Sequence, residues 1–150
     1  GLPVLVAEIP RGGTRWNQAN FDLATFQEFF GATPGQQHRV ILRHVSDSGT
    51  LEEIESRPSV AVVSQNYRFE LGAAAGLPYP SSGRPIGVFL KMATRLFVYK
   101  LVLPGDTGHL ALNGFLETQS NVAIGRMKRV RTDSETLKSI WPTSPLWTTA

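Results

Sequence analysis

The stretch IGVFLKMATRLFVYKLVLPGDTGHLALNGFLE, residues 86–117, contains a dense run of strand-forming residues. Its branched aliphatic and aromatic residues fall into three short segments bounded by turn residues, which is typical of β-strands. We therefore predict strands at residues 86–91, 95–103 and 109–117, the last two joined by the turn PGDTG. Three strands in quick succession favour a mainly β fold.

The rest of the chain continues this pattern on both sides. Further strands are predicted at residues 2–9, 38–45, 59–65 and 121–130. The strands at 38–45 and 59–65 are expected to pair across an acidic connection at residues 47–55. The glycine- and proline-rich residues 72–87 predict a long loop, because neither helix nor ladder persists in such a composition.

Two short helices are predicted among these strands. The first lies in FDLATFQEFFG, residues 21–31, where apolar residues recur at helical spacing and Asp22 is placed to cap the start. The second covers residues 135–141, with Asp133 or Ser134 as its cap. Six to eight short strands with at most two short helices predict a barrel or a sandwich.

Size and composition favour one globular domain spanning residues 1–150. The 150 residues suit a single domain, and 41% hydrophobic with 18% charged residues supplies a packed interior. The chain has no cysteine, which excludes a disulfide framework, a thiolate nucleophile and a cysteine-ligated zinc site. The first ten residues are too short for a membrane span and carry Glu8, so we expect no membrane partner. Without cysteine, the default expectation is a cytoplasmic location.

Signals of catalysis are missing from the sequence. The three histidines, His38, His44 and His109, stand apart from other ligands at metal-site spacing. The acidic-x-Lys pattern of magnesium-dependent nucleases is absent, as are a nucleophile elbow and a phosphate-binding loop. We therefore predict that this segment is not an enzyme and holds no metal or cofactor.

The small net charge of +3 hides an uneven distribution. No acidic residue stands between Glu70 and Asp106 or between Glu117 and Asp133, while basic residues occur in both intervals. The polar loop RGGTRWNQAN, residues 11–20, is also free of acids and contains the Arg, Asn and Gln side chains that read base edges. Acid-free basic segments are typical of a surface that faces phosphates, although solvated polar loops remain an alternative.

The order of these pieces resembles the DNA-binding pseudobarrel family. The resemblance rests on the succession of FDLATFQEFFG, HVSDSG, VAVVSQNYR and TGHLALNGFLE, and it covers roughly Val4 to Glu117. The family includes the recognition domain of BfiI-type enzymes and plant auxin-response and abscisic-acid-insensitive transcription-factor domains. The chain is most similar to the N-terminal effector-binding domain of EcoRII-type restriction endonucleases.

The resemblance implies a seven-stranded open pseudobarrel with one or two short α-helices and two arms that grip the major groove of DNA. By position, the implied contacts of the N-terminal arm are Arg11, Thr14, Arg15, Trp16, Asn17, Gln18 and Asn20. Those of the C-terminal arm are Gln65, Asn66, Arg68, Ser81, Ser82 and Arg84, extending to Lys91 and Arg95. Outside the resemblance, Lys128 in the tract 126–131 is expected to contact phosphate.

The expected function is sequence-specific recognition of double-stranded DNA by the targeting or effector domain of a restriction endonuclease. By resemblance, the target is a CCWGG-like site. Because the chain begins at Gly1 rather than methionine, we expect a fragment of a larger enzyme whose covalently linked nuclease domain binds Mg²⁺.

Two alternatives stay open at the level of sequence. One is the DNA-recognition module of a methylation-dependent, nucleotide-driven restriction system. The other is a non-enzymatic phage or secretion-system structural protein, in which Trp16, Trp141 and Trp147 anchor protein contacts.

Overall fold

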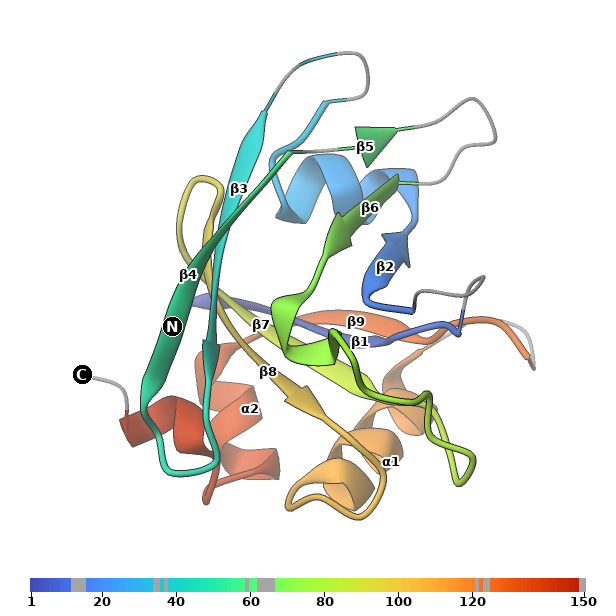
Figure 1. Ribbon diagram of the computed structural model, residues 1–150. Helices are drawn as coiled ribbons and strands as arrows, with labels where there is room; N and C mark the ends of the chain where they lie inside the picture. Colours follow the sequence, from blue (N-terminus) through green and yellow to red (C-terminus); the bar gives the residue numbers. More distant parts are fainter. Residues whose placement is uncertain are drawn as a thin grey trace.

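The fold is seen in a computed structural model (Figure 1). The structure describes residues 1–11, 16–33, 36, 38–58, 60–61, 67–120, 122 and 125–148, with the backbone alone at 18, 20, 60, 61 and 148. These described residues form nine strands and two α-helices, together with a short π-helix and two 3-10 turns.

Six strands form a mixed sheet in the order β4-β3-β8-β7-β1-β9. All neighbours are antiparallel except β3 and β8, which run parallel with Ile41 opposite Leu96. The strands of this sheet are β1 (Pro3–Glu8), β3 (Arg39–Val45), β4 (Leu51–Pro58), β7 (Ile86–Ala93), β8 (Leu96–Val102) and β9 (Arg129–Asp133).

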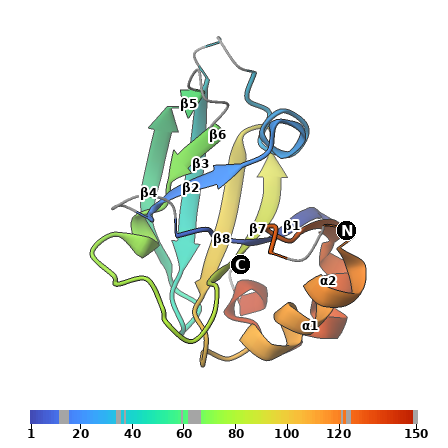
Figure 2. The same ribbon diagram turned by 90° about the vertical axis from the view of Figure 1, so that its right-hand side faces the viewer.

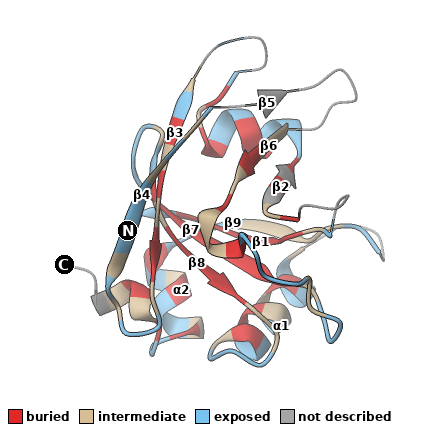
Figure 3. Ribbon diagram, viewed as in Figure 1, coloured by how far each residue is buried: buried red, intermediate tan, exposed pale blue. Residues whose placement is uncertain are grey.

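The central strands of this sheet are covered on both faces. Residues Val4 to Glu8 of β1 are all buried, and so are Ile86 to Leu90 of β7 (Figure 3). Continuous burial explains why these segments, apart from Glu8, are apolar rather than alternating. The apolar runs of the sequence therefore identify the middle of the sheet.

A second, three-stranded sheet lies over one face of the first (Figure 2). It pairs β2 (Gln18–Phe21) with β6 (Tyr67–Glu70), and β6 with β5 (Val60–Ala61). The π-helix η1 (Thr25–Phe29) packs beside it and begins where the Asp22 carboxylate accepts the amide of Thr25.

Phenylalanine rings fill the space between the two sheets. Phe30 is fully buried, with its ring centroid 4.8 Å from that of Phe21, 4.9 Å from Phe69 and 5.4 Å from Phe89. Aromatic pairs at such distances add to the free energy gained from burying their area. This core joins the two sheets into an open barrel.

Two α-helices cover the other face of the six-stranded sheet, at the bottom of Figure 1. These are α1 (His109–Gln119) and α2 (Ser134–Ile140), and the 3-10 turn η3 (Pro145–Thr148) follows α2. Asp133 caps α2 by accepting the amide of Thr136. Another 3-10 turn, η2 (Gly72–Ala74), begins the long crossing that leads from β6 to β7.

The mainly β, open pseudobarrel architecture expected from the sequence is confirmed. The predictions of a first strand, a helix capped by Asp22 and a helix capped by Asp133 are also confirmed. The strand expected at residues 121–130 starts later, because β9 begins at Arg129.

The prediction of a strand at residues 109–117 is wrong, since these residues belong to α1. Leu110 and Leu112 suggested alternation, but Leu110 is 88% exposed and the buried residues are His109, Leu112 and Leu116. Spacings of three and four residues place these side chains on one face of a helix.

The prediction that residues 47–55 form a connection is also wrong for most of these residues, because β4 begins at Leu51. β4 is an edge strand whose Glu52, Glu53 and Ile54 are exposed. An edge strand needs little apolar burial and is protected by its charges, which removes the sequence signal. The strand expected at 59–65 is described only as β5, and the rest of it lies outside the described residues.

Candidate nucleic-acid interface

The two arms expected from the sequence arise from opposite ends of one ladder. β2 pairs with β6 so that Gln18 lies opposite Glu70 and Phe21 lies opposite Tyr67. The N-terminal arm reaches the ladder at Gln18, and the C-terminal arm begins next to its other end, at Tyr67. At about 3.3 Å per residue, the two roots are separated by about 10 Å along the ladder.

The structure describes only part of each arm. Arg11 is exposed, Asn17 and Arg68 are half-buried, and Gln18 and Asn20 are placed by their backbone in β2. Predicted contacts outside the described residues are Thr14, Arg15, Gln65 and Asn66.

Trp16 anchors the N-terminal arm to the domain rather than projecting from it. Its ring is buried, its Nε1 donates to the Leu77 carbonyl at 2.6 Å, and it meets the Tyr79 ring edge-on at 5.4 Å. On the other side of the arm, the Tyr79 hydroxyl donates to the Ile9 carbonyl at 2.8 Å. The chain is therefore held just before the arm and again at Trp16 by the same short segment.

Arg84 is occupied by contacts within the protein. Its Nη1 lies 3.1 Å from Glu8 Oε1 and 3.2 Å from the Arg126 carbonyl, while Nη2 donates to the Gly125 carbonyl at 3.2 Å. Glu8 is buried and also accepts the Lys128 amide at 2.8 Å. Arg84 thus holds the 125–128 segment against the end of β1.

The predicted contacts Ser81, Ser82, Lys91 and Arg95 lie elsewhere. Ser81 and Ser82 are exposed in the crossing between β6 and β7. Lys91 belongs to the end of β7 that pairs with the start of β1, away from Arg11. Arg95 occupies the β7–β8 turn at φ 56° and donates to the Gly31 carbonyl at 3.1 Å. These two basic residues are not brought to the arms.

Among basic side chains in the described part of the chain, five make no hydrogen bond or ion pair with another described residue: Arg11, Arg68, Lys91, Arg126 and Lys128. Four of them are here called the unpaired cations: Arg11 at the start of the N-terminal arm, Arg68 in β6, and Arg126 and Lys128 in the 125–128 segment. The amide of Glu8 donates to the Lys128 carbonyl at 2.9 Å, so the 125–128 segment runs beside the end of β1 (Figure 1).

A groove of about 760 Å³ lies between the start of η1 and the 122–131 segment. Arg126, Arg129 and Arg131 line it from one side, and Asp22 lines it from the other. Arg129 Nη1 lies 3.5 Å from Asp22 Oδ1, with the guanidinium 5.6 Å from the centre of the Phe21 ring.

The charges in this groove favour an anion. Burial favours the neutral acid, but hydrogen bonds from Thr25 and the Arg129 charge outweigh it, and the pKa of Asp22 is lowered. Burial lowers the pKa of Arg129, while Asp22 and Glu8 oppose this effect. Because Asp22 is committed to Arg129, the exposed guanidinium of Arg126 is available to an incoming anion. The lack of acidic residues in the sequence pointed to the tract 126–131. The sequence did not show that Asp22 and Glu8 lie next to that tract in the fold.

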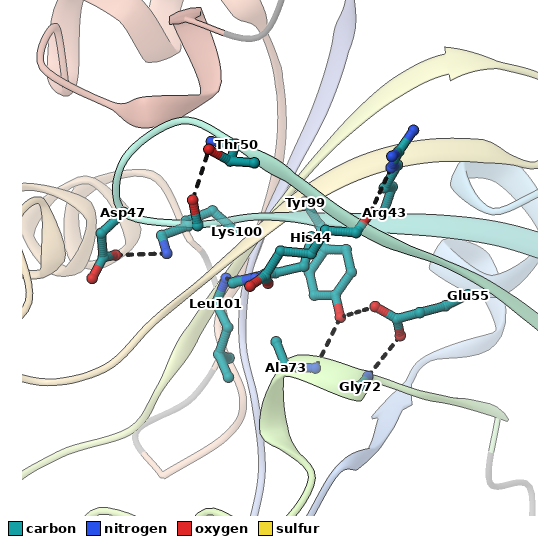
Figure 4. A network of polar contacts seen from close by, with 12 residues as sticks. Arg43, His44, Asp47, Thr50, Glu55, Gly72, Ala73, Tyr99, Lys100 and Leu101 are labelled. Carbon is teal, nitrogen blue, oxygen red and sulfur yellow. Dashed lines mark hydrogen bonds and ion pairs between the residues drawn. The ribbon is translucent and has the colours of Figure 1, made fainter.

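A second concentration of ionisable groups lies across β3, β4 and β8 (Figure 4). His44 Nδ1 contacts Glu52, and its Nε2 accepts the Leu101 amide at 3.0 Å. Since Nε2 is an acceptor, the ring is neutral, and burial lowers the pKa of His44.

The neighbouring Tyr99 and Lys100 are also engaged by the fold. The Tyr99 hydroxyl donates to Glu55 Oε2 at 2.7 Å, and Lys100 Nζ lies 2.7 Å from Asp47 Oδ1. Such partners make this network a clamp between strands rather than an open site. Within the described ranges, no three His, Asp or Glu side chains are grouped so as to hold a metal ion. None of the helices in those ranges is both long and apolar enough to cross a membrane.

The fold is similar to that of the N-terminal domain of Helicobacter pylori LlaJI.R1. The TM-score is 0.63 at 12% sequence identity, over 89% of this chain and 99% of that domain. No protein-family model matches the chain, and no curated protein matches it. At this identity the likeness concerns the fold alone.

Proposed function

We propose that this domain binds double-stranded DNA sequence-specifically and serves as the targeting or effector domain of a restriction endonuclease. The observation that carries the proposal is the set of unpaired cations at the start of the N-terminal arm, in β6 and in the 125–128 segment. Basic side chains that have no partner among the described residues can replace the counterions of DNA phosphates.

The geometry of the ladder supports binding to a duplex. Arms rooted about 10 Å apart suit the major groove of B-DNA, which is about 12 Å wide. Arg68 lies between the two roots, opposite Asn20 in the register. The groove lined by Arg126 lies beside the start of η1. In this proposal, the groove receives a phosphate. Arms in the groove and cations at its border would combine base reading with phosphate contacts.

The structural neighbour supports the restriction context. LlaJI.R1 is a restriction-system protein, and the likeness extends over nearly the whole of its N-terminal domain. In this proposal, cleavage belongs to a separate nuclease domain in the parent protein, where Mg²⁺ would act. The present domain would select the DNA sequence to which the parent protein binds.

Fluorescence anisotropy with a labelled duplex of random sequence tests the proposal first. Four phosphate contacts predict a slope of log K against log[salt] of about −3.6. Lys138→Gln is a matched control, because Lys138 lies on α2 and pairs with Glu135. Lack of duplex binding at 50 mM salt would overturn the proposal.

Selection from a random duplex library tests sequence specificity. CCWGG duplexes, with and without cytosine methylation, serve as defined competitors and separate the expected target from methylation-dependent recognition. Asn17→Ala should lower preference for the selected sequence by about 1–3 kcal/mol per bidentate contact, with little change for random duplex. The same result is expected for Arg15→Ala. Equal losses on selected and random duplexes would contradict the base-reading role of the N-terminal arm.

A further inference from the structure

The crossing between β6 and β7, residues 71–85, contacts both the N-terminal arm and the 125–128 segment. The proposed function assigns DNA contacts to both. We propose that this 71–85 segment positions the N-terminal arm relative to the 125–128 segment, and that Arg84 is a positioning residue rather than a phosphate contact. The inference rests on the proposed function and names how its interface is held in shape.

The first anchor fixes the start of the 71–85 segment to the six-stranded sheet. Glu55 of β4 accepts the Gly72 amide at 2.6 Å, and the Tyr99 hydroxyl accepts the Ala73 amide at 3.3 Å (Figure 4). Tyr99 is fully buried, and the Glu55 side chain is 11% exposed. A buried carboxylate with these partners holds the backbone in one place.

The second anchor fixes the N-terminal arm. Tyr79 bonds to the Ile9 carbonyl just before the arm, and Leu77 accepts the indole N–H of Trp16 within it. The Leu71 amide also donates to the Asn17 carbonyl at 2.7 Å. The 71–85 segment therefore holds the chain at Ile9, Trp16 and Asn17.

The third anchor is Arg84, which bonds to the carbonyls of Gly125 and Arg126 and to the buried Glu8. On its other side, the Arg84 carbonyl lies 2.8 Å from His109 Nε2 in α1. A guanidinium that bridges two carbonyls and a carboxylate cannot turn to a phosphate without releasing the 125–128 segment. Its charge is used to place Arg126 and Lys128.

Three anchors on one segment explain how distant residues act together. The N-terminal arm and the 125–128 segment are separated by more than a hundred residues in the chain, yet each is tied to residues 77–84. If the spacing between the unpaired cations matters for a specific site, loss of the third anchor must weaken specific binding without removing a phosphate contact.

Three variants test this in the full chain: Arg84→Gln, Glu8→Gln and, as a matched control, Arg126→Gln. Each is first checked for native circular dichroism. Arg84→Gln and Glu8→Gln should each lower affinity for the selected duplex by about tenfold, with an unchanged salt slope. Arg126→Gln should reduce the steepness of the slope by about 0.9, the value for one phosphate contact.

Glu8→Gln gives the sharpest discrimination. Removal of a negative charge should strengthen DNA binding if only electrostatics matter, whereas a positioning role predicts weaker specific binding. The double variant should lose less than the sum of the two single losses, because both changes break the shared contact between Glu8 and Arg84. A smaller slope for Arg84→Gln, or tighter specific binding by Glu8→Gln, would overturn the proposal.

Hydrogen exchange provides a readout without DNA. Arg84→Gln should speed amide exchange in residues 125–128 by about tenfold and leave the α1 peptide 109–119 unchanged. Unchanged exchange in residues 125–128 would overturn the inference while leaving the proposed function standing. If the wild-type chain bound no duplex, the proposed function would fall, and the positioning role in DNA binding would fall with it.

Discussion

Replacing Tyr99 by phenylalanine removes one oxygen atom from the network in Figure 4 and leaves the ring in place. The ring stacks on Phe89 with centroids 5.5 Å apart and planes at 15°, and this contact does not need the hydroxyl. The variant therefore removes only the two hydrogen bonds of the hydroxyl, to Glu55 and from the Ala73 amide. Burial, reinforced by the Glu55 carboxylate, raises the pKa of Tyr99, so the wild-type hydroxyl stays protonated at neutral pH.

The expected loss follows from the partners of the hydroxyl. A buried hydrogen bond to a charged acceptor contributes about 1.5–3 kcal/mol. The Tyr99 hydroxyl lies 2.7 Å from Glu55 Oε2, while its contact with the Ala73 amide at 3.3 Å is longer and weaker. We expect the free energy of unfolding to fall by about 2–3 kcal/mol, which corresponds to roughly 4–12 °C in Tm.

Urea denaturation followed by circular dichroism measures this loss at pH 7. Tyr79→Phe is the matched control, because its hydroxyl donates to the neutral Ile9 carbonyl at 2.8 Å and should contribute about 1 kcal/mol. The denaturant dependence should be the same in all three proteins. A loss below about 0.5 kcal/mol for Tyr99→Phe, or one smaller than in the control, would refute the reasoning about the clamp.

Three further outcomes are expected. Burial lowers the pKa of His44 in the folded protein, so the stability gained from its neutral ring is present above the unfolded pKa of about 6.5 and is lost as the pH falls. The free energy of unfolding should drop between pH 7 and 5 by at most about 1.4 kcal/mol per pH unit. Urea titrations of His44→Gln should show a weaker dependence of stability on pH. Lys128→Ala should weaken anisotropy-measured binding to all duplexes alike, and selective loss on one sequence would contradict a phosphate contact. Gly108→Ala should lower the free energy of unfolding, measured by thermal denaturation, by at least about 2 kcal/mol, because φ is 93° and a Cβ would overlap Trp141. Gly114→Ala has open space around it and should stabilise α1 by about 0.5–1 kcal/mol.

The sequence predicted those elements whose burial pattern is local. Strands β7 and β8 were identified because nearly all of their residues are apolar, with Lys91 and Lys100 as the exceptions. Helix η1 was identified because Phe26, Phe29 and Phe30 recur at helical spacing. Strand β4 carries no such pattern, since Ile54 is 64% exposed at a charged edge. Helix α1 was misread because Leu110 faces solvent and imitates the alternation of a strand.

The sequence predicted which basic segments belong to the candidate site, but not which of their side chains are held by contacts within the protein. The acid-free tracts pointed to the arms and to residues 126–131. The commitment of Arg84 depends on Glu8, 76 residues earlier, and on Gly125, 41 residues later. A single sequence shows that an arginine is present, but only the fold shows which partner it has.

The position of β1 between β7 and β9 also constrains the order of events during translation. The Glu8 side chain bonds to the Lys128 amide across a separation of 120 residues, so β1 leaves the ribosome long before its second neighbour exists. At 5–20 residues per second, the wait lasts about 6–24 s. During that time the apolar segment Val4 to Ala7 lacks its pairing with β9, and an unpaired apolar strand on a nascent chain is prone to aggregate.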